Sequence, residues 1–236
     1  YIKKNAELNF GNSGTLARLL LGILSTTPNI NIKIRGDHSL NKRSMKKLIN
    51  LLSKFGATFL PNNKYTFPLK MISSEMPVGI EYKAGVSAQL KSAVLLAGLN
   101  SYGNTIIEEQ IISRDHTENL LMKNIQSIKN TKNKKKIIKV KGKSYLNPLN
   151  LNIGGDPSSA AFFAALTLLN KNSTLKIKNV GLNPTRTGFY EILKKQKVKI
   201  NFKNIIKDNN EIRGDILIKS SKLKPMNVQA SLYPRT

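Results

Sequence analysis

Arginine is scarce in this chain, and three of its seven arginines stand at equivalent places. Arg43, Arg114 and Arg186 are 71 and 72 residues apart, and a segment with helical spacing of apolar residues follows each one. A guanidinium group carries a planar fork of N–H donors that matches two oxygens of a phosphate or a carboxylate at once. These residues therefore predict the recognition of anionic small molecules.

Small polar residues begin a second set of helical segments, one ahead of each arginine. Ser13 precedes Gly14 in the stretch GNSG, Ser87 begins Ser-Ala-Gln, and Ser158 begins a run of apolar residues. Serine caps helices, and the free N–H groups at a helix start carry about half a positive charge, which attracts anions. A cap with tight packing explains GNSG equally well, so an anion site at Gly14 is one of two readings.

Gln89 is the polar residue that its surroundings explain least. It stands one turn inside the segment that begins at Ser87, among residues that are almost all apolar. A buried amide needs hydrogen-bond partners. Gln89 can bond to the backbone or, together with Ser87, face a polar ligand, and the sequence leaves both readings open.

These residues belong to one layout of strands and helices that recurs along the chain. An apolar helix, an alternating strand and a second helix with an arginine at its start occupy residues 11–55, recur over 84–118 and recur again over 156–195. Spacing this regular predicts one supersecondary unit used three times in compact α/β (α+β) domains. The third apolar helix, from Ser158 to Leu169, is expected to be buried on all sides.

Two consecutive glycines predict a domain boundary. A strand is expected from Leu149 to Ile153, and Gly154 and Gly155 after it mark a hinge or a tight crossing. We therefore expect a first domain over residues 1–154 and a second over 155–236. The chain starts at Tyr1 rather than at methionine, which suggests a fragment that begins inside a domain.

The composition excludes several classes of site and of partner. The chain has 236 residues, no cysteine and two histidines, so thiolate chemistry is excluded and neither a metal nor a cofactor is expected. No apolar run approaches the ~20 residues of a membrane span, and the N-terminus has no signal-peptide core. We expect a cytoplasmic protein without a membrane partner.

A formal charge of +26 would suit a basic nucleic-acid-binding protein, which is the alternative from another class. The lysines are spread over nearly every segment, however, and aromatic residues form only 6% of the chain. Nucleic-acid modules concentrate their charge and expose aromatic side chains for stacking. We therefore interpret the lysines as a solvated surface and expect no nucleic-acid partner.

Five stretches, in order along the chain, carry a resemblance to a known family. They read GNSGT, SAQLKSAVLLAGL, RDHTE, GDPSSAAF and NPTRTG. The chain resembles the 5-enolpyruvylshikimate-3-phosphate synthases, also named 3-phosphoshikimate 1-carboxyvinyltransferases, and RDHTE and Leu19 after Arg18 are similar to their glyphosate-tolerant bacterial branch. The resemblance implies two domains of three βαβαββ units each, with helices inside and sheets outside. Residues 1–154 would hold about two units of the first domain, and residues 155–236 about one unit of the second.

The resemblance also implies an activity of the shikimate pathway, on the route to chorismate and the aromatic amino acids. Such enzymes transfer the enolpyruvyl group of phosphoenolpyruvate to the 5-hydroxyl of shikimate 3-phosphate and release phosphate. They are expected to act as monomers when full length. The positions that match the family's binding motifs are Ser87, Ala88, Gln89 and Arg114 for shikimate 3-phosphate, and Gly14, Arg43 and Gln89 for phosphoenolpyruvate.

The match has two gaps that bear on activity. The family's N-terminal substrate residues would precede Tyr1, and its catalytic carboxylate and general-base lysine would follow Thr236. No catalytic residue is therefore assigned, and the chain alone is expected to be inactive. The alternative within the fold is UDP-N-acetylglucosamine enolpyruvyl transferase, but its reactive-loop cysteine has no counterpart here and RDHTE argues against it.

Overall fold

The structure, a computed structural model, describes residues 6–122, 125–130, 135–225, 227–228 and 235. The chain divides into two compact units, which are described separately. Unit 1 combines Tyr1–Ile111 with Leu121–Leu146, and unit 2 combines Ile112–Leu120 with Asn147–Thr236. The short segment Ile112–Leu120 thus belongs to unit 2, although its neighbours in sequence belong to unit 1. The boundary expected at Gly154–Gly155 stays a prediction about the domains of the whole protein.

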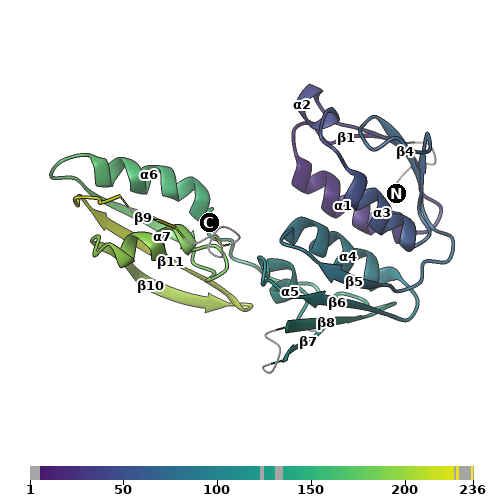
Figure 1. The fold of residues 1–236 in the computed structure, drawn as a ribbon. Helices are drawn as coiled ribbons and strands as arrows, with labels where there is room; N and C mark the ends of the chain where they lie inside the picture. The colour runs from purple at the N-terminus through teal and green to yellow at the C-terminus, as the bar shows by residue number, and fades with distance from the viewer. Residues whose placement is uncertain (1–5, 123–124, 131–134, 226, 229–234, 236) are drawn as a thin grey trace. The chain divides into compact units, whose positions relative to one another are not determined.

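Unit 1 contains the repeated layout twice (Figure 1). The elements of its first repeat are β1 (Glu7–Asn9), α1 (Gly14–Thr26), β2 (Asn31–Arg35), α2 (His38–Asn41), α3 (Lys46–Lys54), β3 (Thr58–Leu60) and β4 (Leu69–Ile72). Those of the second are β5 (Glu81–Ala84), α4 (Ala88–Asn100), β6 (Asn104–Glu109), β7 (Ile125–Asn130) and β8 (Lys135–Lys141). The strand orders β1-β2-β4-β3 and β5-β6-β8-β7 are equivalent, and in each sheet the first two strands run parallel.

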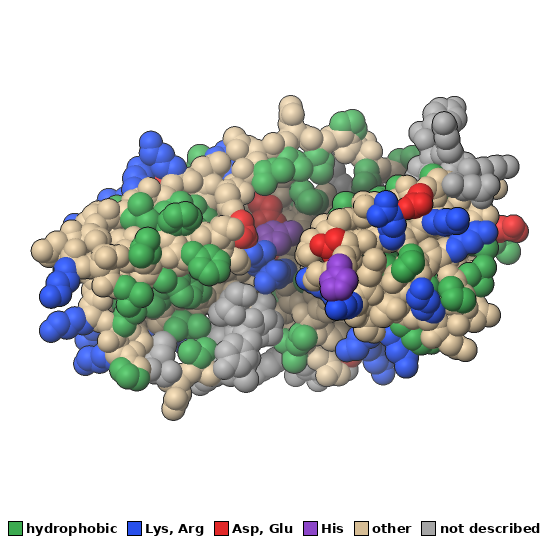
Figure 2. Space-filling view, turned by 90° about the horizontal axis from the view of Figure 1, so that it is seen from above, with side chains coloured by type: hydrophobic (Ala, Val, Ile, Leu, Met, Phe, Trp, Pro, Cys, Tyr) green, Lys and Arg blue, Asp and Glu red, His purple; other side chains and the backbone are tan. Residues whose placement is uncertain are grey.

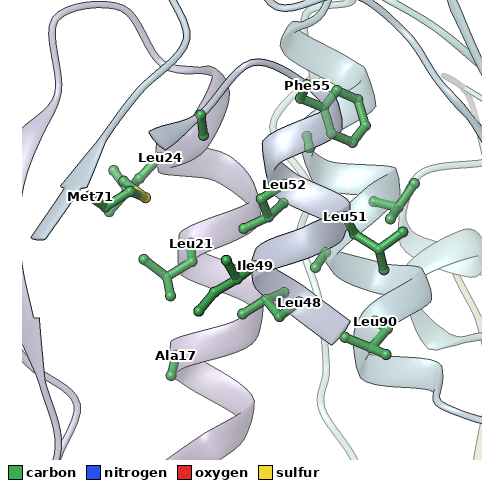
Figure 3. Close-up of a cluster of buried hydrophobic side chains, with 14 of the residues drawn as sticks. Ala17, Leu21, Leu24, Leu48, Ile49, Leu51, Leu52, Phe55, Met71 and Leu90 are labelled. Atoms are coloured by element: carbon green, nitrogen blue, oxygen red, sulfur yellow. The ribbon is translucent and has the colours of Figure 1, made fainter. Parts of the chain in front are cut away.

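The core of unit 1 lies between its helices and the inner faces of its two sheets. Strand β2 alternates buried and exposed residues, as a strand with one solvated face should. Figure 3 shows Leu48, Ile49 and Leu52 of α3 facing Leu21 of α1, and all four side chains are buried. The prediction of helices inside and sheets outside is confirmed for this unit.

Unit 2 contains the third copy of the layout. Its elements are α5 (His116–Leu120), α6 (Pro157–Leu169), β9 (Thr174–Gly181), α7 (Gly188–Lys195), β10 (Ile200–Asp208) and β11 (Glu211–Lys219). The sheet order is β10-β11-β9, and both long helices contribute to one core against it. The prediction of one supersecondary unit used three times is confirmed, with α5 as the second helix of the second copy.

The strand expected from Leu149 to Ile153 is wrong. Those residues form no strand, and the place of a first strand is taken by a single parallel bridge between Gly155 and Val180. Gly155 N–H donates to the Asn179 carbonyl at 2.7 Å, and Gly155 accepts from the Gly181 N–H at 2.8 Å. Residues 149–153 alternate as a strand would, but in this part of the chain β9 pairs only with Gly155, which follows them.

Helix α6 corrects two further predictions. Its N-cap is Asp156, whose side chain accepts from the Ser159 N–H, so the helix begins at Pro157 rather than at Ser158. The helix is not buried on all sides either. Its outward residues are between 59% and 79% exposed, and they are Phe162, Phe163, Leu166 and Leu169. Figure 2 looks down on the α6 side of unit 2, where hydrophobic side chains gather.

The longest helices in the described part of the chain have 13 residues. Thirteen residues of α-helix extend roughly 20 Å, about two thirds of a bilayer's hydrocarbon thickness. None of the described helices therefore has both the length and the apolar content of a membrane-spanning segment.

Helices α1 and α4 run parallel and are in direct contact along their length. Thr15 meets Gln89 at their N-terminal ends, and Asn100 donates to the Thr26 carbonyl at their C-terminal ends. Between these contacts the backbones approach closely, because a Cβ built on Gly22 would lie 2.5 Å from the Ala93 carbonyl oxygen. The missing side chain of Gly22 is what lets the two helices come together.

Replacing that glycine should separate the helices. Alanine is the better helix former by about 1 kcal/mol, but Gly22→Ala should still destabilise unit 1 by about 1–3 kcal/mol, because its methyl group meets rigid backbone. Urea unfolding followed by circular dichroism measures this. The control is Gly85→Ala, where a Cβ would meet nothing within 4 Å and the change should stay within about 0.5 kcal/mol. Equal effects of the two substitutions would contradict the close approach.

Candidate functional site

The N-terminal ends of α1 and α4 lie side by side in unit 1. Ser13 caps α1 by accepting from the Leu16 N–H at 3.1 Å, and Ser87 caps α4 by accepting from the Leu90 N–H at 3.4 Å. Both caps confirm the helix starts that the sequence predicts. Neither helix has an acidic residue in its first turn. Two positive helix ends therefore meet without a negative side chain in either first turn.

Gly14, the first residue of α1, lies beneath two guanidinium groups. A Cβ built on Gly14 would lie 2.8 Å from Nη1 of Arg18 and 3.5 Å from Nη1 of Arg43. Arg43 stands just ahead of α3, as the repeat predicts, and its side chain is exposed. Two arginines and a helix N-terminus thus converge on a position that has no side chain of its own.

Arg43 is tethered to the segment that precedes α1. Its Nη2 donates to Asn12 Oδ1 at 3.5 Å, and Asn12 Nδ2 donates to Asp37 Oδ2 at 2.7 Å. The pKa of the Asp37 carboxyl lies below its ordinary value, because the N–H of Leu40 and the amide of Asn12 donate to it, with the charge of Arg43 as a smaller cause. Asp37 thereby stays ionised and holds Asn12 in place.

Gln89 bonds to side chains of the neighbouring helix and not to the backbone. Its Nε2 donates to Thr15 Oγ1 at 2.7 Å, and its Oε1 accepts from Arg18 Nη1 at 3.0 Å. It is half-buried. Of the two readings of Gln89 from the sequence, the backbone-bonded one is wrong. Ala88 follows the cap as the first residue of α4, so Ser87, Ala88 and Gln89 form the first turn beside α1.

The charge at this site is wholly positive among the groups that converge on Gly14. Burial lowers the pKa of Arg18, and the nearby charge of Arg43 lowers it further. Two guanidinium groups this close to each other favour the binding of a phosphate or carboxylate group nearby.

Arg114 belongs to unit 2, where it precedes α5 as the repeat predicts. Burial lowers the pKa of Arg114, the charge of Arg186 lowers it further, and Asp156 opposes this. Helix α5 is attached to the rest of unit 2 through Glu211, which lies 2.9 Å from His116 Nδ1 and accepts from Asn119 at 2.9 Å. The expectation that Arg114 shares a site with Ser87 stays a prediction.

Arg186, the third arginine of the repeat, holds the start of α6. Its Nη2 donates to Asp156 Oδ1 at 2.6 Å and to Ser158 Oγ at 2.7 Å. Ser158 therefore serves as the acceptor for this arginine and not as the cap. A cavity of about 360 Å³ lies beside this pair within unit 2, with His116 and Glu211 also in its wall.

Three residues of the site in unit 1 escaped the sequence analysis, namely Asn12, Thr15 and Arg18. Thr15 could have been found, because it precedes Gln89 by 74 residues and occupies the same place after the cap. Arg18 gives no such signal, because its partner Gln89 is 71 residues away, whereas equivalent positions of α1 and α4 are 74 residues apart. Among the described residues no group of three His, Cys, Asp or Glu side chains is arranged to hold a metal ion.

Comparisons with known proteins agree over nearly the whole chain. Residues 1–235 match the model of the family described as EPSP synthase (3-phosphoshikimate 1-carboxyvinyltransferase). The chain is 41% identical to the 3-phosphoshikimate 1-carboxyvinyltransferase of Petrotoga mobilis over 99% of its length, and 39% identical to that of Novosphingobium aromaticivorans. It spans about half the length of the curated relatives that it matches, namely 54% and 53%.

Solved structures show the same relationship. EPSP synthase from Acinetobacter baumannii superposes with a TM-score of 0.80 at 35% identity, over 97% of this chain and 51% of that one. The enolpyruvyl transferase NikO from Streptomyces tendae gives a TM-score of 0.56 at 12% identity, over 87% of this chain and 46% of that one. The second likeness shows a shared fold alone.

The cap of α6 gives a pH-dependent prediction. Burial alone would raise the pKa of Asp156, but the hydrogen bonds from Ser159 and the charge of Arg186 outweigh it and lower the pKa. A carboxyl group whose pKa is lowered by folding stabilises the fold fully at pH values above its ordinary pKa of 3.8. This stabilisation is lost as the pH falls through the pKa of the folded state.

Asp156→Asn should keep the cap, because asparagine caps as well as aspartate, and lose only the charge. At pH 7 the variant should be less stable by at most about 1 kcal/mol, since the ion pair with Arg186 is partly exposed. The difference should shrink as the pH falls below 3.8. Urea unfolding at several pH values measures it, and a difference that grows toward acid would contradict the assignment.

Proposed function

This chain belongs to the EPSP synthase (3-phosphoshikimate 1-carboxyvinyltransferase) family, and from that membership we propose that it binds phosphoenolpyruvate and shikimate 3-phosphate. In the whole enzyme the enolpyruvyl group of the first would pass to the 5-hydroxyl of the second, with release of phosphate. The observation that carries the proposal is the group formed by Gly14, Arg43 and Gln89 at the paired helix starts. The protein would act in the cytoplasm as a monomer.

Phosphoenolpyruvate suits the N-terminal end of α1 because it carries two anionic groups on a small frame. The helix dipole favours a negative charge at this end, and the first turn of α1 has no acidic residue. Arg43, exposed and tethered by Asn12, can donate two hydrogen bonds to one phosphate or carboxylate group. Gln89 has an amide that reaches both helices, so it can contact this ligand and the second substrate.

Shikimate 3-phosphate is proposed to lie at the N-terminal end of α4. The backbone N–H groups of Ser87, Ala88 and Gln89 belong to the first turn of that helix, where the orphan donors attract a phosphate. The match to the family's binding motifs adds Arg114, which would donate a charge-assisted hydrogen bond to this substrate. The proposal thus gives each phosphate its own helix start, with Gln89 common to both.

The residues of this chain are proposed to bind and orient the substrates rather than to move protons. The reaction must deliver a proton to the methylene carbon of phosphoenolpyruvate and remove one from the substrate hydroxyl. Of the four carboxylates near the recognised motifs, Asp37 and Asp156 cap helices, and Asp156 also pairs with Arg186. Asp115 accepts hydrogen bonds from Asn183 and Thr185, and Glu118 is buried. None of the four is therefore assigned a part in proton transfer.

Arg43→Ala tests the phosphoenolpyruvate site. Loss of a charge-assisted hydrogen bond should weaken binding by about 1.5–3 kcal/mol. Titration calorimetry of the 236-residue chain with phosphoenolpyruvate measures this. Lys42→Ala removes a charge from the adjacent exposed residue and should change the affinity by less than about 1 kcal/mol. Equal losses for the two variants would indicate general charge attraction and contradict a built site.

Arg114→Ala tests the proposed binding of shikimate 3-phosphate. Binding of shikimate 3-phosphate should weaken by about 1.5–3 kcal/mol, because the arginine would donate directly to the phosphate. The matched control is Lys199→Ala, which removes one exposed charge from the same unit. If calorimetry gives the same affinity for the Arg114 variant and for the unsubstituted chain, Arg114 does not bind shikimate 3-phosphate.

A further inference from the structure

Arg18 has no assigned role, yet it is the most connected side chain at the start of α1. Its Nη1 donates to the Gly14 carbonyl oxygen at 3.0 Å and to Gln89 Oε1 at 3.0 Å. The first bond turns the side chain back along its own helix, since the two residues are four positions apart. The second crosses from α1 to α4. One nitrogen of Arg18 therefore links the first turn of α1 to Gln89 of α4.

The two ends of the Gln89 amide are held by different chemistry. Arginine can only donate hydrogen bonds, so the atom that faces Arg18 must be the amide oxygen. The Thr15 hydroxyl can donate or accept, so by itself it would tolerate either orientation of the amide. Arg18 therefore decides which way the amide points. Nε2 has a second N–H beyond the one given to Thr15, and an amide in this orientation can offer it to an anion.

The guanidinium of Arg18 occupies the space that a side chain at Gly14 would need. The nearest atom to a Cβ built there is Nη1 of Arg18, at 2.8 Å, and Arg43 Nη1 is farther away at 3.5 Å. A methyl group at this position therefore has to displace the guanidinium that also holds Gln89. The glycine and the amide are linked through one arginine, although 75 residues of sequence separate them.

We propose that Arg18 is a positioning residue, which orients the Gln89 amide for the anionic substrate and makes Gly14 necessary for that orientation. The proposal rests on the binding function proposed for this site. Arg18 acts through Gln89, and its own guanidinium, turned onto the Gly14 carbonyl and the amide oxygen, is not the group that holds the ligand. Loss of Arg18, loss of Thr15 and a methyl group at Gly14 should all release the same amide.

Thr15→Val is the sharpest test, because it preserves shape and charge while it removes one anchor of the amide. It should move the side-chain amide signals of Gln89 in nitrogen–proton NMR spectra and weaken phosphoenolpyruvate binding about 3- to 10-fold. Thr15→Ser, which restores the hydroxyl, should restore both. Gln89→Met identifies the signals by their loss.

Arg18→Ala and Gly14→Ala should move the same amide signals and weaken binding about 10-fold. Combined with Gln89→Met, Arg18→Ala should add less than a 2-fold loss, because residues that act as one unit are not additive. Lys42→Ala, which removes a nearby charge, should leave the amide signals in place. Backbone amide spectra of every variant confirm that unit 1 is folded.

Two results would overturn the inference. One is an amide of Gln89 whose signals stay unmoved by Arg18→Ala and by Thr15→Val. The other is an additive loss of affinity in the double variant, which would make Arg18 a direct ligand of the anion. If the unsubstituted chain shows no saturable binding of phosphoenolpyruvate, the proposed function fails, and the amide signals, recorded without ligand, still decide whether Arg18 orients Gln89.

Discussion

The parallel contact between α1 and α4 is the constraint on which the rest of unit 1 depends. Parallel helices place two positive ends next to each other, which is electrostatically unfavourable. The contact persists because Gly22 lets the backbones approach, and because Asn100 satisfies a carbonyl at the opposite end. Helix α3 covers the pair from one side (Figure 3). Packing thus holds together two helix ends that electrostatics alone would separate.

The arrangement concentrates positive charge where it costs stability. Arg18 and Arg43 both approach Gly14, and burial of Arg18 adds to their repulsion. A protein selected for stability alone would place acidic residues in the first turns of these helices, and neither helix has one. Local conflict of this kind is typical of functional sites, where the fold supports an arrangement that a ligand completes.

The sequence predicts those features that depend on neighbours along the chain. The serine caps and the arginines before each second helix are local signals, and the repeat makes them visible three times. The cap of α6 at Asp156 was not predicted, although Pro157 after it is a local signal of a helix start. The serine caps of the other two repeats suggested Ser158 instead.

Features that depend on tertiary contacts escaped prediction. Lys91 is fully buried against Glu109, an ion pair that joins α4 to β6. In β8, Lys136 is buried near the same carboxylate while Ile137 is exposed, so the interpretation of the lysines as a solvated surface is wrong at Lys136. When apolar residues lie all around a helix, as in α6, the sequence does not indicate which face packs against a neighbouring element. The contact of Arg18 with Gln89 lies in the same class, since Gln89 is not the residue that the 74-residue spacing of the two helices places opposite Arg18.

The contacts between α1 and α4 also have a symmetry. Thr15 meets Gln89 and Thr26 meets Asn100, and each pair is separated by 74 residues, so each of these residues touches its own counterpart in the other repeat. Two identical copies related by a rotation axis would make the same contacts. Identical copies, however, must carry every substitution twice. With both halves in one chain, Arg18 of α1 can donate to Gln89 of α4 while its counterpart in α4 is Ser92, and the asymmetry that orients one amide becomes possible.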